Sequence, residues 1–244
     1  TAGGLAAGAN VIANHVTAEV ADSSVAAASN ASIAATSASI IRTLALGVSG
    51  SGSNAVSVSA LGNDVSSSTT AQITGSTLVA GDDVLVTASD EAPLITPSWM
   101  LTAEQQADVD DALDGSPIEL DANILALNVS VAGSGSKAVG VALMGNVIAN
   151  SVSTLIDDST VLAGVDELGN VTNSEADIAV TTVSDAGIIA LSVGVAASGS
   201  TAVQASGFGN VIANRTSAVI ASDSEVASGG NLTVSADDSS QIRS

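Results

Sequence analysis

The chain has 244 residues with 25 acidic and only 4 basic side chains, so its formal net charge at pH 7 is −21. Apolar residues make up 46% of the chain, which excludes a disordered acidic tail, because so much aliphatic surface can be buried in a core. The few scattered basic residues exclude sequence-independent binding of nucleic acid, and the lack of Cys excludes disulfides and thiolate metal sites.

One sequence block recurs along the chain and sets its organisation. Gly-Asn-Val-Ile-Ala-Asn occurs at 145–150 and again at 209–214, with degenerate copies at 9–14 and 62–65. In three copies an Ala-Val pair precedes the block, and before that pair comes a segment rich in Gly and Ser, such as 49–53. The Asn residues that anchor the four copies are spaced 53, 83 and 64 residues apart; they are Asn10, Asn63, Asn146 and Asn210.

Residues before each Gly/Ser-rich segment alternate between bulky aliphatic and small or polar side chains. The sequence at 127–131 is Leu-Asn-Val-Ser-Val, and the copies at 44–48 and 191–195 alternate in the same way. This period of two, with its β-branched residues, predicts strands. We expect one set of side chains to face the core, namely Leu127, Val129, Val131, Leu191, Val193 and Val195. The other set should face outward or into tight contacts, namely Asn128, Ser130, Ser192 and Gly194.

The segment 124–149 contains Lys137 as its only charge and is long enough for a membrane helix. Its alternation and its central Gly-Ser-Gly-Ser indicate strands instead. No insertion into membranes is therefore expected. The acidic charge also disfavours binding to anionic membrane surfaces.

The recurring strands and turns predict an all-β fold, a parallel β-helix (solenoid) built from 53–64-residue repeats. We interpret residues 1–244 as a single β-solenoid segment of a longer protein. Each repeat is expected to span two or three coils, although the Gly/Ser-rich segments could instead be hairpin turns. The four anchoring Asn residues should stand in register at one bend, where their amides either hydrogen-bond along the stack or simply favour a turn.

The segment 90–123 interrupts the repeat, since the spacing of 83 residues exceeds that of 64 by 19. All three prolines of the chain lie in this segment. Thr102 and Gln105 form the pattern of a capping box, and Gly115 is a plausible helix stop. We predict that 90–123 is an inserted loop that carries a short α-helix.

Acidic side chains gather in and after this predicted helix. Asp110, Asp114 and Asp121 could bind Ca²⁺, because carboxylates at such spacings resemble the ligands of a calcium loop. The pattern departs from an EF-hand, since Ala112 occupies the third position and Asp121 replaces the usual Glu. The alternative is a solvated acidic helix end. No other cofactor is expected.

Catalytic chemistry is not indicated by the sequence. His15 is the only His, and the other copies have Ser or Arg at its position, so we expect an exposed turn residue. Paired carboxylates recur in predicted turns, as at 82–83 and 157–158, and no aromatic platform for a sugar accompanies them. We therefore predict that the chain is not an enzyme.

The order of these blocks resembles that of very large repetitive bacterial surface proteins. Aliphatic alternation, Ser-Gly-Ser-Gly, Ala-Val, Gly-Asn-Val-Ile-Ala-Asn and the closing Gly-Gly-Asn-Leu-Thr-Val-Ser-Ala at 229–236 are similar to filamentous-haemagglutinin-like adhesins and fusobacterial leukotoxin-type repeat proteins. The resemblance covers nearly the whole chain except about 90–123. It implies a secreted or cell-surface right-handed parallel β-helix that acts as an adhesin, stalk or matrix fibre, with no catalytic motif to carry over.

These observations predict a non-catalytic structural or adhesive segment of a giant extracellular bacterial repeat protein. Its location would be extracellular or at the bacterial cell surface, and its partner an unknown cell-surface or matrix ligand. The alternative is a self-assembling extracellular fibre or sheath subunit that stacks end to end, because open solenoid ends expose strand edges. Nucleic acid is not an expected partner in either case.

Overall fold

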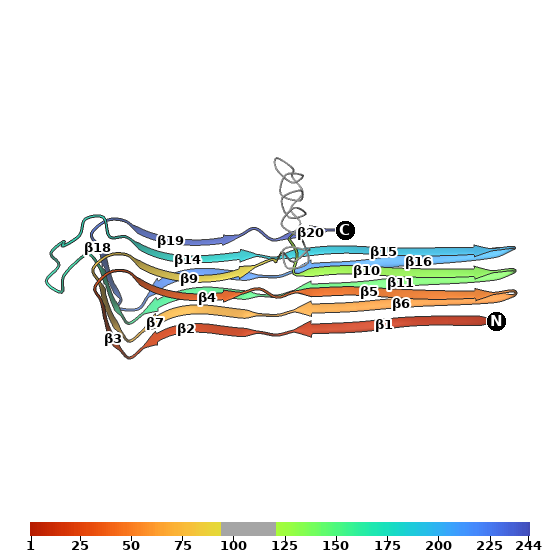
Figure 1. The fold of residues 1–244 in the computed structure, drawn as a ribbon, viewed down its shortest axis with the longest axis horizontal. Coiled ribbons are helices and arrows are strands. Elements are labelled where there is room, and N and C mark those ends of the chain that lie inside the picture. The colour runs from red at the N-terminus through yellow and green to blue at the C-terminus, as the bar shows by residue number, and fades with distance from the viewer. Residues whose placement is uncertain (94–120) are drawn as a thin grey trace, which may run out of the picture.

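The computed structural model describes residues 1–93 and 121–244, and every helix or strand assigned in these two parts is a β-strand (Figure 1). The chain winds through four successive coils. The predicted short helix within 90–123 lies outside the described residues.

The strands of each coil follow one another in the same order. The first coil consists of β1 (Ala2–Ile12), β2 (His15–Ala21), β3 (Ser24–Ala27), β4 (Ala31–Ser37) and β5 (Ile41–Ser51). The second consists of β6 (Asn54–Val65), β7 (Ser68–Thr74), β8 (Thr77–Ala80), β9 (Val84–Glu91) and β10 (Ile124–Ser134). The third consists of β11 (Lys137–Ile148), β12 (Ser151–Asp157), β13 (Thr160–Ala163), β14 (Ile178–Asp185) and β15 (Gly187–Ser198). The fourth consists of β16 (Thr201–Ile212), β17 (Arg215–Ala221), β18 (Glu225–Ser228), β19 (Leu232–Asp238) and β20 (Gln241–Arg243).

Equivalent strands of successive coils pair in parallel, and each set forms a four-stranded sheet. The predicted all-β parallel solenoid is therefore confirmed. Asn10 pairs with Asn63, Asn63 with Asn146, and Asn146 with Asn210, so each repeat corresponds to one coil. The expectation of two or three coils per repeat is wrong, because five strands of a single repeat are needed to complete one turn of this wide solenoid.

A coil without insertions has the length of the shortest repeat, 53 residues. The spacing of 64 residues reflects a second insertion, which the sequence analysis did not identify. Residues 164–177 connect β13 to β14, whereas only residues 81–83 connect β8 to β9. Gly164 opens this longer connection with a φ of +60°, a conformation that suits Gly. The loop then closes on itself through an antiparallel bridge between Val165 and Val171.

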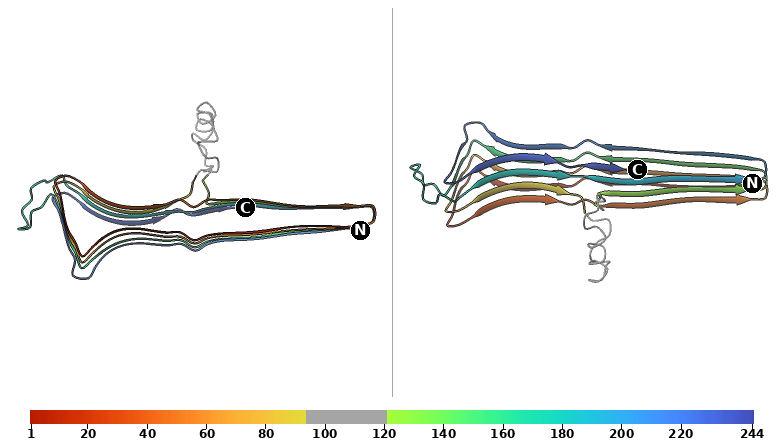
Figure 2. Two further views of the ribbon diagram at one scale, coloured as in Figure 1. Left: turned by 60° about the horizontal axis from the view of Figure 1, so that its bottom comes forward. Right: turned by 90° about the horizontal axis from the view of Figure 1, so that it is seen from above.

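The molecule is elongated along its strands and has two distinct parts (Figures 1 and 2). One part, which we call the arm, has two layers, with the β1-β6-β11-β16 sheet facing the β5-β10-β15-β20 sheet. In the other part, the wide section, the β2-β7-β12-β17 and β4-β9-β14-β19 sheets diverge, and the short β3-β8-β13-β18 sheet closes the end. The junction between the two parts is called the waist.

Gly/Ser-rich turns reverse the chain at the tip of the arm. The strands on either side of each turn belong to different sheets, so these turns are not β-hairpins. Successive turns stack on one another, as the backbone N–H of Gly135 donates to the carbonyl of Ser51 over 3.1 Å. A Cβ on Gly135 would collide with the carbonyl oxygen of Gly52, so this stacking requires Gly.

Large aliphatic side chains fill the wide section and the waist. The wide section buries, among others, Ile73, Leu78, Val86, Ile156 and Ile178. The waist buries a second cluster that includes Val65, Ile124, Ile148 and Ile188. Both clusters lie outside the narrow outer half of the arm.

Candidate functional site

The interior of the arm is filled by small and polar side chains. Ser130 Oγ donates to the carbonyl of Ser57 in the facing sheet over 3.1 Å, and Asn128 Nδ2 donates to the carbonyl of Leu143 over 2.7 Å. A Cβ on Gly47 would stand only 2.8 Å from Ser57 Oγ. The two sheets thus approach to near backbone contact, whereas ordinary stacked sheets lie about 10 Å apart.

This close approach reverses the expected orientation of the strands. Asn128 and Ser130 are fully buried, whereas Leu191 is 54% exposed. The prediction that Leu127, Val129, Val131, Leu191, Val193 and Val195 face a core is therefore wrong. The gap between the sheets admits only Gly, Ala, Ser and Asn in this part of the arm, so the bulky side chains of the same strands point outward.

The outward side chains of β5, β10 and β15 form a regular apolar surface, which we call the aliphatic grid. It comprises three rows of aligned residues: Leu44, Leu127 and Leu191; Leu46, Val129 and Val193; and Val48, Val131 and Val195. The β5 and β15 residues are exposed, up to 67% at Leu44, and the β10 residues between them are half-buried. Exposed apolar patches of this regularity mark interaction surfaces.

The outer face of the β1-β6-β11-β16 sheet, which we call the first-strand face, is also apolar but less continuous. Val56, Leu143 and Val203 are exposed on it. A row of Gly residues, including Gly62 and Gly145, separates its aliphatic rows at one level. The arm therefore has two different apolar faces back to back.

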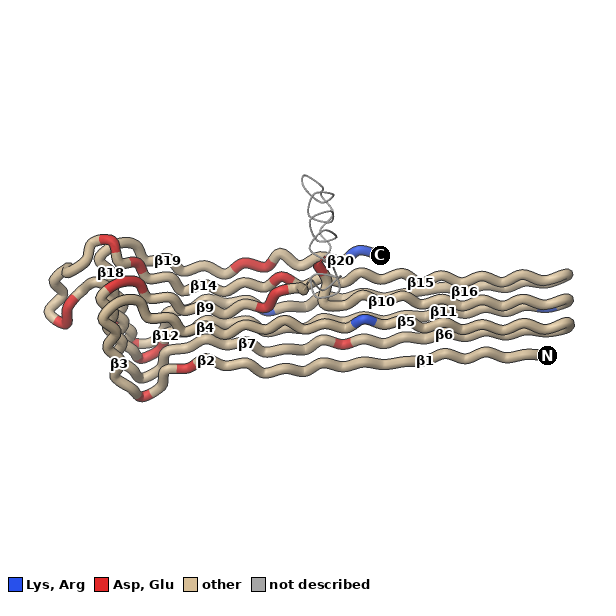
Figure 3. Tube along the Cα trace, in the orientation of Figure 1, with Lys and Arg blue, Asp and Glu red and all other residues tan. Residues whose placement is uncertain are grey.

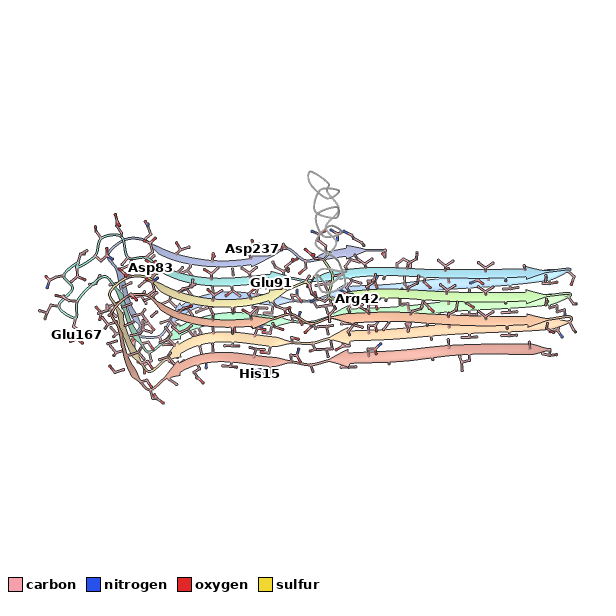
Figure 4. The ribbon with its side chains drawn as sticks, in the orientation of Figure 1. His15, Arg42, Asp83, Glu91, Glu167 and Asp237 are labelled. Atoms are coloured by element: carbon pink, nitrogen blue, oxygen red, sulfur yellow. The ribbon has the colours of Figure 1, made fainter. Side chains whose placement is uncertain are left out.

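Charge is distributed unevenly between the two parts of the molecule. The eight strands of the arm carry one acidic residue, Asp64, and three basic ones, Arg42, Lys137 and Arg243. Acidic residues gather in the turns of the wide section and at the waist, as Figure 3 shows. Figure 4 shows Asp83 and Glu167 in the wide section, away from the arm. The surface that is apolar is thus also the surface that is nearly free of negative charge.

The four anchoring Asn residues form a continuous hydrogen-bonded column. Asn10 Nδ2 donates to Asn63 Oδ1 over 3.0 Å, Asn63 Nδ2 to Asn146 Oδ1 over 2.8 Å, and Asn146 Nδ2 to Asn210 Oδ1 over 2.7 Å. Asn63 and Asn146 are buried. The residues lie within β1, β6, β11 and β16 near the waist, and not at a bend as expected. Their amides satisfy one another in the interior, so the column has a structural role.

A second polar ladder was not anticipated from the sequence. The side chain of Asn150 accepts a hydrogen bond from the backbone N–H of Ser67 over 2.9 Å, and that of Asn214 accepts one from the backbone N–H of Asn150 over 3.1 Å. These residues end the repeated block, where Asn14 stands in the first copy. The recurrence of this last Asn was the signal that could have revealed the ladder.

Asp90 is a buried carboxylate beside this ladder at the waist. Asn150 Nδ2 donates to its Oδ2, and its Oδ1 has no hydrogen-bond partner among the described residues. Burial raises the pKa of Asp90, against the opposing effect of hydrogen bonds from Ser37 and Asn150. The acid of an isolated buried carboxyl with one polar partner serves no recognisable reaction.

The predicted calcium site can be followed only in part. Asp110 and Asp114 lie outside the described residues, and Asp121 is half-buried just before β10. Within residues 1–93 and 121–244, no three His, Asp or Glu side chains lie close enough together to hold a metal ion. His15 is exposed at the start of β2 and shares a hydrogen bond of 3.2 Å with Thr17 Oγ1.

Asp166 organises the longer loop at 164–177. It accepts hydrogen bonds from the backbone N–H of Leu168 and of Asn170 and from the Asn170 amide. The Asn170 hydrogen bonds hold the pKa of Asp166 below its usual value. The carboxylate is thus used to hold the loop in its turn.

No helix among the described residues is long and apolar enough to cross a membrane. Comparison of the chain with protein-family models, with curated proteins and with solved structures finds no match.

Proposed function

We propose that the chain is a non-catalytic structural and adhesive segment of a giant extracellular bacterial repeat protein. The observation that supports this most directly is the pair of exposed apolar faces on an arm that has a single acidic residue in its strands. Such faces suit contact with a cell-surface or matrix ligand, because burying them removes apolar area from water without desolvating charges.

The dimensions of the coil favour a broad surface over a long reach. Each coil of 53 residues or more advances the stack by only one strand spacing, about 4.8 Å. Every further coil would instead add one row of side chains to each face of the arm. A protein built in this way forms a wide wall, which supports a role in adhesion or in a surface layer more than that of a thin stalk.

Adhesion can be tested with beads that carry the chain, placed under flow on alkane-terminated and hydroxyl-terminated surfaces. We expect retention on the alkane surface that persists at high salt. The double variant Val56→Ser/Leu143→Ser should lower this retention several-fold, because it interrupts the first-strand face. A matched control is Leu85→Ser/Val219→Ser, which changes two exposed aliphatic residues of the wide section. Equal retention of both variants, or no retention on either surface, would contradict the proposal.

A second candidate is a self-assembling extracellular fibre or sheath subunit. The constant parallel register of the four coils favours it, since β1–β5 at one end and β16–β20 at the other present matching edges. Electron microscopy at rising concentration distinguishes the two functions. Filaments that grow along the stacking direction would support the fibre, and isolated particles the adhesive segment.

A further inference from the structure

We infer that the aliphatic grid is a pairing surface for a second copy of this chain, joined face to face through β5, β10 and β15. This contact is lateral, and so it differs from end-to-end stacking of coils. It leaves both first-strand faces on the outside of the pair, where the proposed adhesive contact would occur.

The first argument is the shape of the grid. Its rows are aligned across three parallel strands, Leu with Leu and Val with Val, except for Leu46 beside Val129. Two such flat surfaces can interdigitate as the inner faces of a β-sandwich do. The exposure of Leu44 (67%) and Leu46 (56%) leaves much of each side chain available for burial.

The second argument is area. Strands β5 and β10 have 11 residues each, which at about 3.3 Å per residue gives a face about 36 Å long. Three strands at a spacing of about 4.8 Å make it about 14 Å wide, so each copy contributes about 500 Å². The pair buries about 1,000 Å² in total, which is the lower limit of specific interfaces and corresponds to a micromolar dimer.

The third argument is charge. Two copies that each carry −21 repel one another, and acidic residues are concentrated in the wide section and at the waist. The grid has no charged member, and Arg42 is the charged residue of β5 (Figure 4). An antiparallel pairing of arms places the two wide sections at opposite ends. The grid is therefore the place where two copies meet with the least repulsion.

Lipid is the competing occupant of an apolar face. An anionic membrane would repel a chain of this charge, and a neutral membrane would have no preference between the two faces of the arm. A second copy fits the flat and regular grid better than mobile acyl chains do.

Sedimentation velocity over a range of micromolar concentrations tests this inference. We expect a dimer whose dissociation constant rises at least about tenfold in Leu46→Ser/Val193→Ser. The matched control is Val56→Ser/Leu143→Ser on the first-strand face, which should leave the dimer intact. A monomer at all concentrations up to about 100 μM, or equal weakening by both variants, would overturn the inference.

Cross-linking supplies a second measurement that does not depend on a destabilising change. The chain has no Cys, so Val129→Cys at the centre of the grid provides a unique thiol. A short bismaleimide should link Val129→Cys into covalent dimers and should leave Val141→Cys, on the first-strand face, unlinked. Absence of a linked species from Val129→Cys would contradict pairing even if the serine variants fail to fold.

Vesicles of neutral phosphatidylcholine complete the test. Co-sedimentation of a monomeric chain with these vesicles, lost in Leu46→Ser/Val193→Ser, would assign the grid to lipid and overturn the inference. The bead assay depends on the first-strand face and not on the grid, so failure of pairing and failure of adhesion are distinguishable.

Discussion

Removal of the Asn146 side chain should destabilise the solenoid at its centre. Asn146 is fully buried, accepts a hydrogen bond from Asn63 over 2.8 Å and donates one to Asn210 over 2.7 Å. Asn146→Ala breaks both bonds and leaves two amide groups of the neighbouring coils without this partner. Asn63 Nδ2 keeps its hydrogen bond to Thr43 Oγ1 over 3.1 Å, which limits the damage on that side.

The magnitude follows from counting these groups. Each lost hydrogen bond contributes about 1 kcal/mol, and each buried group left unpaired adds about 1–3 kcal/mol. With Asn63 still partly satisfied, we expect Asn146→Ala to lower the free energy of unfolding by about 2–4 kcal/mol. Asn10 is exposed and makes only one hydrogen bond in the column, so Asn10→Ala should lower it by about 1 kcal/mol. The exposed His15 should tolerate Ala within about 0.5 kcal/mol.

Urea unfolding of the three variants measures these differences, and hydrogen exchange locates them. Because each coil contacts only its neighbours, protection should fall first in β6, β11 and β16 around the change. If Asn146→Ala and Asn10→Ala unfold at the same urea concentration and show equal protection, the column does not stabilise the stack. Its Asn residues would then be interchangeable with other small polar residues.

Three further predictions concern the arm, the waist and the insertion. Gly47→Ala should lower the free energy of unfolding by about 1–3 kcal/mol, because the sheets must separate, whereas Gly62→Ala has open space and should be neutral; equal urea midpoints would contradict the close approach of the sheets. The folded pKa of Asp90 is raised, so its contribution to stability is greatest at low pH and is lost as pH rises from its unfolded pKa, about 3.9, towards the folded value. Asp90→Asn should therefore be more stable than the native chain at neutral pH but not at acid pH, and parallel pH profiles of thermal unfolding would refute this. Ca²⁺, if the predicted site exists, should bind with millimolar affinity and lose any effect on melting temperature in Asp110→Asn/Asp114→Asn; a chain with no calorimetric signal has no such site.

The repeat in the sequence was sufficient to predict the class of fold. Recurrence of the same block at Asn10, Asn63, Asn146 and Asn210 requires equivalent positions in space, and a stack of parallel strands provides them. The number of coils per repeat could not be predicted, since it depends on how many strands close one turn. The connection at 164–177 was missed because no coil without an insertion was recognised as the reference.

Alternation in the sequence established that each arm strand has two different faces, but it could not decide which face is inside. A period of two is the same whether Leu127 or Asn128 points inward. In the wide section, where the sheets diverge, large residues such as Ile73 fill the space between them. In the arm the sheets come into near contact, Gly47 and Ser57 occupy the gap, and the aliphatic residues are left outside. The separation of the two sheets is a property of the folded coil, and this separation made the face expected to form the core into the exposed surface.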